Sequence, residues 1–113
     1  MIPRDPSKPY RYTDEKSGVV YLFQYLTDEN EDRFQEICDL SEKARSSGKE
    51  FVREMYRKTI NLFLVGWENF DLPFPTDGNP SKCFIGGNLY KMGKIVNDLI
   101  PELCGLDIDE AKN

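Results

Sequence analysis

The sequence contains no histidine. Histidine is the commonest general base in enzymes, the usual activator of nucleophiles and the commonest ligand of transition metals. Aspartate, glutamate, lysine and tyrosine can also transfer protons, but none of them stands in a recognisable catalytic motif here. We therefore predict a protein that is not an enzyme, with no catalytic residue, no metal and no cofactor.

Cysteine is scarce, and Cys38, Cys83 and Cys104 lie far apart. An odd number of widely spaced cysteines does not indicate a disulfide framework. Cys83 follows Lys82 and resembles a reactive thiol, but no base accompanies it, so we interpret it as a small half-buried residue. Apolar runs are all shorter than the roughly 18 residues of a membrane span, and the first residues lack a signal core. These features predict a soluble, cytoplasmic protein.

Positive charge is also in short supply, with 15 lysines and arginines against 20 aspartates and glutamates, a net charge of −5. An acidic protein gains no counterion-release energy on a phosphate backbone and is not attracted to anionic lipids. Neither nucleic acid nor a membrane is therefore an expected partner.

Aromatic residues are plentiful, and 113 residues are enough for one domain. Three prolines in the first nine residues predict an extended arm over 1–9. The helix and strand patterns occupy 10–106, which we expect to form a single α+β domain. Residues 107–113 read as an acidic C-terminal tail.

Two apolar runs surround a polar turn near the N-terminus. Tyr10–Thr13 and Val19–Leu26 are rich in aromatic and β-branched residues, which favours strands, and the Gly18-containing turn between them predicts a β-hairpin. Both faces of the second run are apolar or aromatic, as in a strand covered on both sides. In so small a domain, this pattern suggests that a partner protein or a second copy covers one face.

Three helices are expected after the hairpin. Thr27, followed by an acidic run, is a good start for the first helix, and residues 46–48 break it. Apolar residues at helical spacing continue the second helix from Lys49 to about Val65, where Gly66 ends it. The third helix begins near Asn88. The fold class is therefore α+β, an N-terminal hairpin packed with about three α-helices.

Two ligand motifs are incomplete. Asp28, Asn30 and Asp32 have the spacing of a calcium loop, but Arg33 stands where the loop requires glycine, so an acidic helix start is the better interpretation. Gly86-Gly87 precedes a helix and resembles a phosphate-binding turn, but it lacks the other residues of such motifs. We interpret these glycines as a hinge or a helix entry.

Residues 67–87 form the most unusual segment, because aromatic residues and prolines alternate over a predicted loop of about twenty residues. Long loops in compact domains are often functional. Aromatic rings in a loop are costly unless they are buried against another part of the protein or against a partner. Trp67 alternatively fills the core beneath the loop. The candidate partner-binding residues are three from the loop and three from the second strand: Trp67, Phe70, Phe74, Tyr21, Phe23 and Tyr25.

The order of these features resembles that of the small tail assembly chaperones and related morphogenesis proteins of tailed bacteriophages and prophages. The matching features are Tyr25-Leu26-Thr27, the acidic run 28–32, Leu64–Glu68, the turn within 73–80 and the helix after residue 87. The resemblance covers most of residues 19–104. It implies binding of a tail or capsid component during virion assembly, in the host cytoplasm, without catalytic residues.

The sequence thus predicts a non-enzymatic protein–protein interaction module, which can also form a homo-oligomer. The alternative is a small acidic inhibitor or regulatory protein that occludes another enzyme or a host factor. Mimicry of nucleic acid would require a continuous acidic face. The carboxylates of this chain are mostly interspersed with lysine and arginine, which argues mildly against that alternative.

Overall fold

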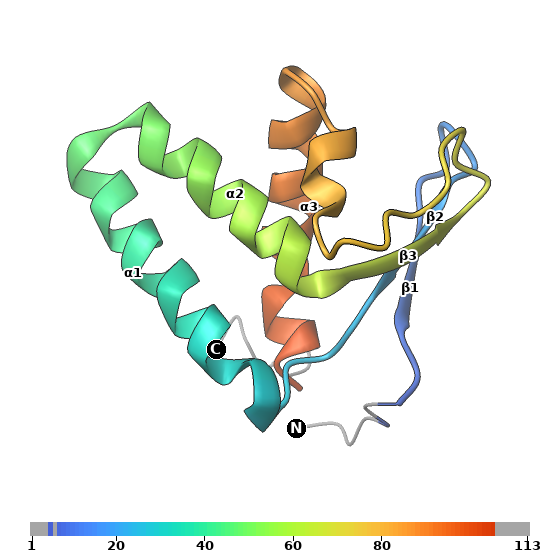
Figure 1. Ribbon diagram of the computed structural model, residues 1–113, viewed down its shortest axis with the longest axis horizontal. Helices are drawn as coiled ribbons and strands as arrows, with labels where there is room; N and C mark the ends of the chain where they lie inside the picture. The colour runs from blue at the N-terminus through green and yellow to red at the C-terminus, as the bar shows by residue number, and fades with distance from the viewer. Residues whose placement is uncertain (1–4, 6, 106–113) are drawn as a thin grey trace.

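The computed structural model describes residue 5 and residues 7–105, so most of the predicted arm over 1–9 and the whole tail over 107–113 lie outside the described residues. The chain forms an α+β fold with the predicted hairpin and three α-helices (Figure 1). The strands are β1 (Tyr10–Thr13), β2 (Val20–Phe23) and β3 (Leu64–Glu68). The helices are α1 (Glu31–Ser47), α2 (Lys49–Phe63) and α3 (Gly87–Leu103), and two 3₁₀ turns are η1 (Asp28–Asn30) and η2 (Pro80–Cys83).

The sheet has one strand more than the sequence predicted. Its order is β1-β2-β3 with both pairs antiparallel, and Tyr12, Tyr21 and Trp67 lie opposite one another across it. Residues 64 and 65 were predicted as the end of the second helix, but α2 ends at Phe63 and the chain continues directly as β3. β-branched and aromatic residues in this segment fit a strand, and pairing with the free edge of β2 decides between the two structures.

Gly66 therefore lies inside a strand and does not terminate a helix. It pairs with Leu22, and a Cβ atom on Gly66 would lie 3.1 Å from Cδ1 of Leu22. A glycine at this position lets β3 approach β2 closely, which is one of the recognised reasons for glycine within a strand.

The central strand β2 is covered by its own chain. β1 and β3 flank it, Val20 and Tyr21 are buried, and Phe23 is completely inaccessible. The run was predicted to continue to Leu26, but the backbone N–H of Leu26 donates to the carbonyl of Leu103 at the end of α3 (2.8 Å). The chain itself therefore buries three of the four β2 residues, and Leu22 stays half-buried.

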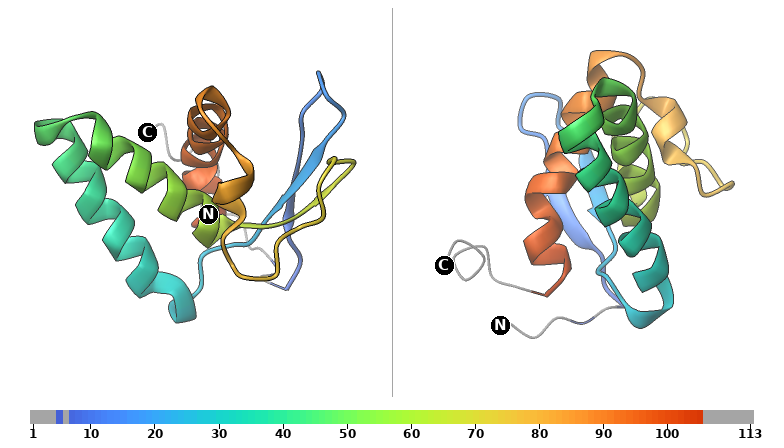
Figure 2. Two further views of the ribbon diagram at one scale, coloured as in Figure 1. Left: turned by 45° about the horizontal axis from the view of Figure 1, so that its top comes forward. Right: turned by 90° about the vertical axis from the view of Figure 1, so that its left-hand side faces the viewer.

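The three helices lie on one side of the sheet, with α1 farthest from it. Figure 1 shows the hairpin of α1 and α2 on one side of the molecule, the sheet on the other and α3 between them, and the turned views of Figure 2 agree. Gly48 joins α1 to α2 with a φ of 103°, which confirms the predicted break. Thr27 was predicted to start the first helix, but it caps the turn η1, where its N–H donates to Oδ1 of Asn30 (2.9 Å), and α1 itself begins at Glu31.

The core lies where α2, α3 and the sheet meet. Its fully buried large side chains come from β2, α2, the start of β3 and α3: Phe23, Ile60, Leu62, Phe63, Leu64, Val96 and Leu103. The crossing of α2 and α3 is close at Gly93, which lies under the ring of Tyr56, and that ring packs edge-on against Tyr90 with centroids 5.8 Å apart. None of the described helices is long and apolar enough to cross a membrane.

The connection from β3 to α3 is shorter than the predicted loop over 67–87. Residues 67 and 68 belong to β3 and residues 80–83 form η2, so the irregular parts are residues 69–79 and the short link 84–86 before α3. The connection is fixed to α2 by the N–H of Ser81, which donates to Oδ1 of Asn61 (2.9 Å), and internally by Lys82 and Asp77 (2.6 Å). Gly86 enters α3 with a φ of 57°, as the helix-entry interpretation required.

Candidate functional site

Five rings from three parts of the chain form one aromatic cluster. Trp67 stacks on Phe70, with ring centroids 4.3 Å apart and an angle of 19° between the planes. Phe74 packs edge-on with Trp67, with ring centroids 4.8 Å apart. Phe84 lies against Trp67, Phe70 and Tyr21 at about 6 Å. Stacked and edge-on arrangements at these separations are the favourable geometries for aromatic pairs. We call Tyr21, Trp67, Phe70, Phe74 and Phe84 the aromatic cluster.

Local hydrogen bonds hold the irregular connection back over the sheet. The indole N–H of Trp67 donates to the carbonyl of Leu72 (2.8 Å), which closes a turn around Phe70. Asn69 has a φ of 64°, and its amide donates to the carbonyl of Gly18 in the β1–β2 turn (3.2 Å). Asparagine tolerates this left-handed conformation better than most residues. These contacts place Phe70 above Tyr21 of the central strand.

The six predicted partner-binding residues separate into two groups. Trp67, Phe70, Phe74 and Tyr21 meet in the aromatic cluster. Phe23 lies in the core with no exposed surface. Tyr25 is half-buried and packs edge-on against Tyr10, with ring centroids 6.4 Å apart. Among the described residues, it forms no ring contact with the other five candidates.

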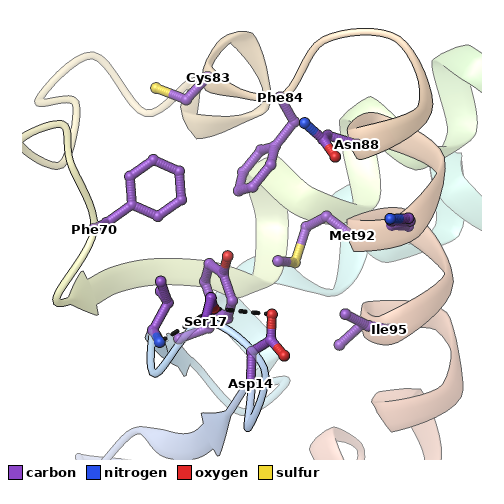
Figure 3. Close-up of a pocket in the computed structure, with 11 residues that line it drawn as sticks. Asp14, Ser17, Phe70, Cys83, Phe84, Asn88, Met92 and Ile95 are labelled. Carbon is purple, nitrogen blue, oxygen red and sulfur yellow. Dashed lines mark hydrogen bonds between the residues drawn. The ribbon is translucent and has the colours of Figure 1, made fainter.

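A groove of about 330 Å³ opens beside the aromatic cluster, between the β1–β2 turn and α3 (Figure 3). Phe70, Phe84 and Met92 converge on it, and Asp14, Ser17 and Ile95 line its lower part. The remaining lining residues are Val19, Tyr21, Cys83, Asn88 and Lys91. We call this hollow the hairpin–α3 groove. Sequence reasoning missed it, although Phe84 beside the glycines and Met92 on the apolar face of the third helix supplied part of the signal.

Charged side chains gather at the lower end of the groove, and only some of them form ion pairs with one another. Asp14 accepts hydrogen bonds from the Ser17 hydroxyl (3.0 Å) and from the N–H of Lys16 (3.1 Å). The groove continues into an open hollow lined by Asp14, Lys16, Lys91, Lys94, Ile95 and Asp98. Lys94 pairs with Asp98 at 3.4 Å, whereas the ammonium groups of Lys16 and Lys91 form no ion pair with any residue in the described part of the chain. With three lysines and two aspartates, the hollow has a formal charge of +1.

Metal ligands and cysteine thiols are the other groups that could form a site. Among residues 7–105, no three histidine, cysteine or acidic side chains gather as they would around a metal. Burial raises the pKa of the Cys38 and Cys104 thiols, so they are weak nucleophiles at neutral pH. Cys83 is half-buried at the groove, as its sequence context suggested, and the supposed calcium-loop residue Asn30 serves the helix start.

No protein family, curated protein or solved structure was found to match this chain. Its function is therefore inferred from the aromatic cluster and the groove.

Tyr21 should make stability depend on pH in alkaline solution. Burial in the aromatic cluster raises the pKa of its phenol above the ordinary value near 10, with smaller contributions from Asp14 and Tyr12. A group whose pKa is raised by folding stabilises fully below its unfolded pKa and loses that contribution as pH rises through the folded pKa. We expect unfolding to become easier above about pH 10.

The matched variant is Tyr21→Phe, because the Tyr21 hydroxyl forms no hydrogen bond with another described residue. Urea midpoints of both proteins, measured between about pH 8 and pH 11, should diverge above pH 10, with the wild type losing more. A difference between the two midpoints that stays constant over this range would contradict the assignment.

Proposed function

We propose that this protein is a non-enzymatic protein-binding module, whose binding surface comprises the aromatic cluster and the hairpin–α3 groove. The observation that carries the proposal is the groove itself, an apolar hollow of about 330 Å³ that opens directly onto a cluster of rings. Aromatic and methionine side chains are the residue types enriched at the centres of protein interfaces.

Exposed apolar side chains beside the groove support the same function. Ile85 follows Phe84 of the groove and is 77% exposed, and Leu72 on the irregular connection is 49% exposed. Leu72 and Phe74 border a further shallow hollow together with Cys83, which also lines the groove. Apolar residues grouped at the edge of a hollow are typical of interaction sites, whereas single scattered ones are not.

The biological setting follows from the resemblance to phage and prophage tail assembly chaperones. On that basis, the partner in our proposal is a tail or capsid component bound during virion assembly. The alternative role is an acidic inhibitor or regulatory protein that occludes another enzyme or a host factor. Its form as a mimic of nucleic acid has less support, because lysines and aspartates together border the groove, and not a continuous acidic surface.

Capture experiments with surface variants test the protein-binding function. Ile85→Glu and Leu72→Glu change exposed side chains beside the groove, and Val65→Glu is the control, because Val65 is also exposed (42%) but lies on β3 outside the groove lining. We expect one protein, quantified by mass spectrometry after affinity capture, to be retained by the wild type and by Val65→Glu and lost from the other two.

Light scattering after size-exclusion chromatography, over a series of concentrations, tests self-association in the same samples. A dimer that Ile85→Glu dissociates would make the partner a second copy of this chain. A protein that stays monomeric at every concentration and captures nothing would overturn the proposed function.

A further inference from the structure

We infer that the occupant of the hairpin–α3 groove is an acidic segment of a partner protein, with a large apolar side chain in the groove and carboxylates beside it. This inference rests on the proposed function and specifies the chemistry of the partner. It follows from the apolar floor of the groove, the charges at its lower end and their positions along α3.

The floor of the groove requires an apolar anchor. Val19, Tyr21, Phe84 and Met92 are each less than a tenth exposed, yet all four line the hollow, so its bottom is formed by the outer surface of the core. A volume of about 330 Å³ is at the lower end of the roughly 300–1,000 Å³ range of ligand pockets. It suits one or two large apolar side chains better than a long ligand.

The charges beside the floor require carboxylates. Three lysines and two aspartates line the adjoining hollow, but Asp98 is paired with Lys94 and Asp14 is held within the β1–β2 turn. Lys16, from the β1–β2 turn, and Lys91, from α3, both line the hollow. In a protein with a net charge of −5, this hollow has a formal charge of +1, from three lysines and two aspartates, and complementary charges steer and orient partners.

The positions of the lysines favour an extended or helical peptide segment. Lys91 and Lys94 are three residues apart on α3, which places them on one face of the helix, separated by a rise of roughly 4.5 Å. An acidic side chain beside Lys91 is therefore close to the Lys94–Asp98 pair, and a second one, roughly 6.6 Å further along an extended segment, would compete with Asp98 for Lys94. Nucleic acid fits poorly, because an apolar floor offers nothing to a phosphate backbone.

The test is selection of peptides on the full-length protein from a display library of random short peptides. We expect the enriched peptides to combine a large apolar residue with neighbouring aspartates or glutamates. The best of them, synthesised with a fluorescent label, should bind the Lys91→Glu and Lys16→Glu variants roughly tenfold or more weakly and lose affinity as salt is added.

Two further variants test whether the effect comes from the charge of Lys91 and from its position at the groove. Lys91→Met retains most of the apolar stem and removes only the charge, so it should weaken binding in the same direction. Arg57→Glu reverses an equally exposed charge on α2, outside the groove, and should bind like the wild type. Thermal unfolding of each variant would verify that the fold is retained.

The outcomes separate this inference from the proposed function. Enriched peptides without acidic residues, or binding that is unaffected by Lys91→Glu and Lys91→Met, would overturn the inference even if Ile85→Glu still abolished capture of a partner. Self-association that Lys91→Glu abolishes would overturn it in favour of a second copy as the occupant. Failure of both peptide selection and partner capture would overturn the proposed function as well.

Discussion

Replacement of Trp67 by alanine is expected to lower the free energy of unfolding by about 3 kcal/mol. Trp67 contacts Phe70, Phe74 and Phe84, and its indole N–H is the donor that closes the turn to Leu72. Truncation would leave a cavity between the sheet and the irregular connection and would free a carbonyl from its donor. The value is set at the lower end for an aromatic residue because Trp67 is only half-buried.

Denaturant unfolding followed by circular dichroism measures this effect, because the variant has lost the only tryptophan of the chain. Trp67→Phe is the matched control, since it keeps a ring in the cluster and removes the N–H, with an expected cost of about 1 kcal/mol. If Trp67→Ala unfolded at the wild-type midpoint but no longer captured the partner, Trp67 would be a binding anchor and not a structural residue.

Replacement of Gly93 by alanine is expected to destabilise the protein by about 2–3 kcal/mol, although alanine is the better helix former. A Cβ atom at Gly93 would lie 2.3–2.7 Å from the Cβ, Cγ and Cδ1 atoms of Tyr56. These atoms are the rigid base of the side chain, so relief requires that α2 and α3 separate or that Tyr56 change rotamer and leave Tyr90. Either movement loosens the helix crossing beside the core.

Thermal and urea unfolding of Gly93→Ala should be compared with those of Gly87→Ala. Gly87 is in the first turn of the same helix, and nothing lies within 4 Å of a Cβ added there. Its replacement should be neutral or stabilising by up to about 1 kcal/mol. Tyr56→Ala should reduce the penalty of Gly93→Ala in a double-mutant cycle. Equal midpoints for the two glycine variants would show that the crossing is not as close as described.

Features with a local cause were predictable from the sequence. The turns and helix ends at Thr27, Gly48 and Gly86 depend only on residues a few positions away. The local residue types were therefore sufficient to predict them. The hairpin belongs to the same class, because a short turn joins its two strands. The four cluster residues Trp67, Phe70, Phe74 and Tyr21 were also identified as candidates, since their concentration is visible in the sequence.

Features that depend on distant contacts were not predictable. The segment 64–68 continues an apolar helical pattern, and only the free edge of β2, some forty residues earlier in the chain, makes it a strand. The hairpin–α3 groove joins Asp14 and Ser17 to Lys91 and Ile95, which lie at opposite ends of the sequence. Periodicity describes one segment at a time, so it cannot show which two segments enclose a hollow.

The direct passage from α2 into β3 has a consequence for how this chain can change length during evolution. The ladder between β2 and β3 already has a register shift between Leu22 and Phe23, so one residue inserted between Phe63 and Leu64 would need a second irregularity or would reverse the faces of the β3 side chains, Trp67 included. The same insertion near Gly78, in the exposed irregular connection, would displace only the connection itself. Insertions and deletions should therefore accumulate in residues 69–79 and be purged at the junction of α2 and β3.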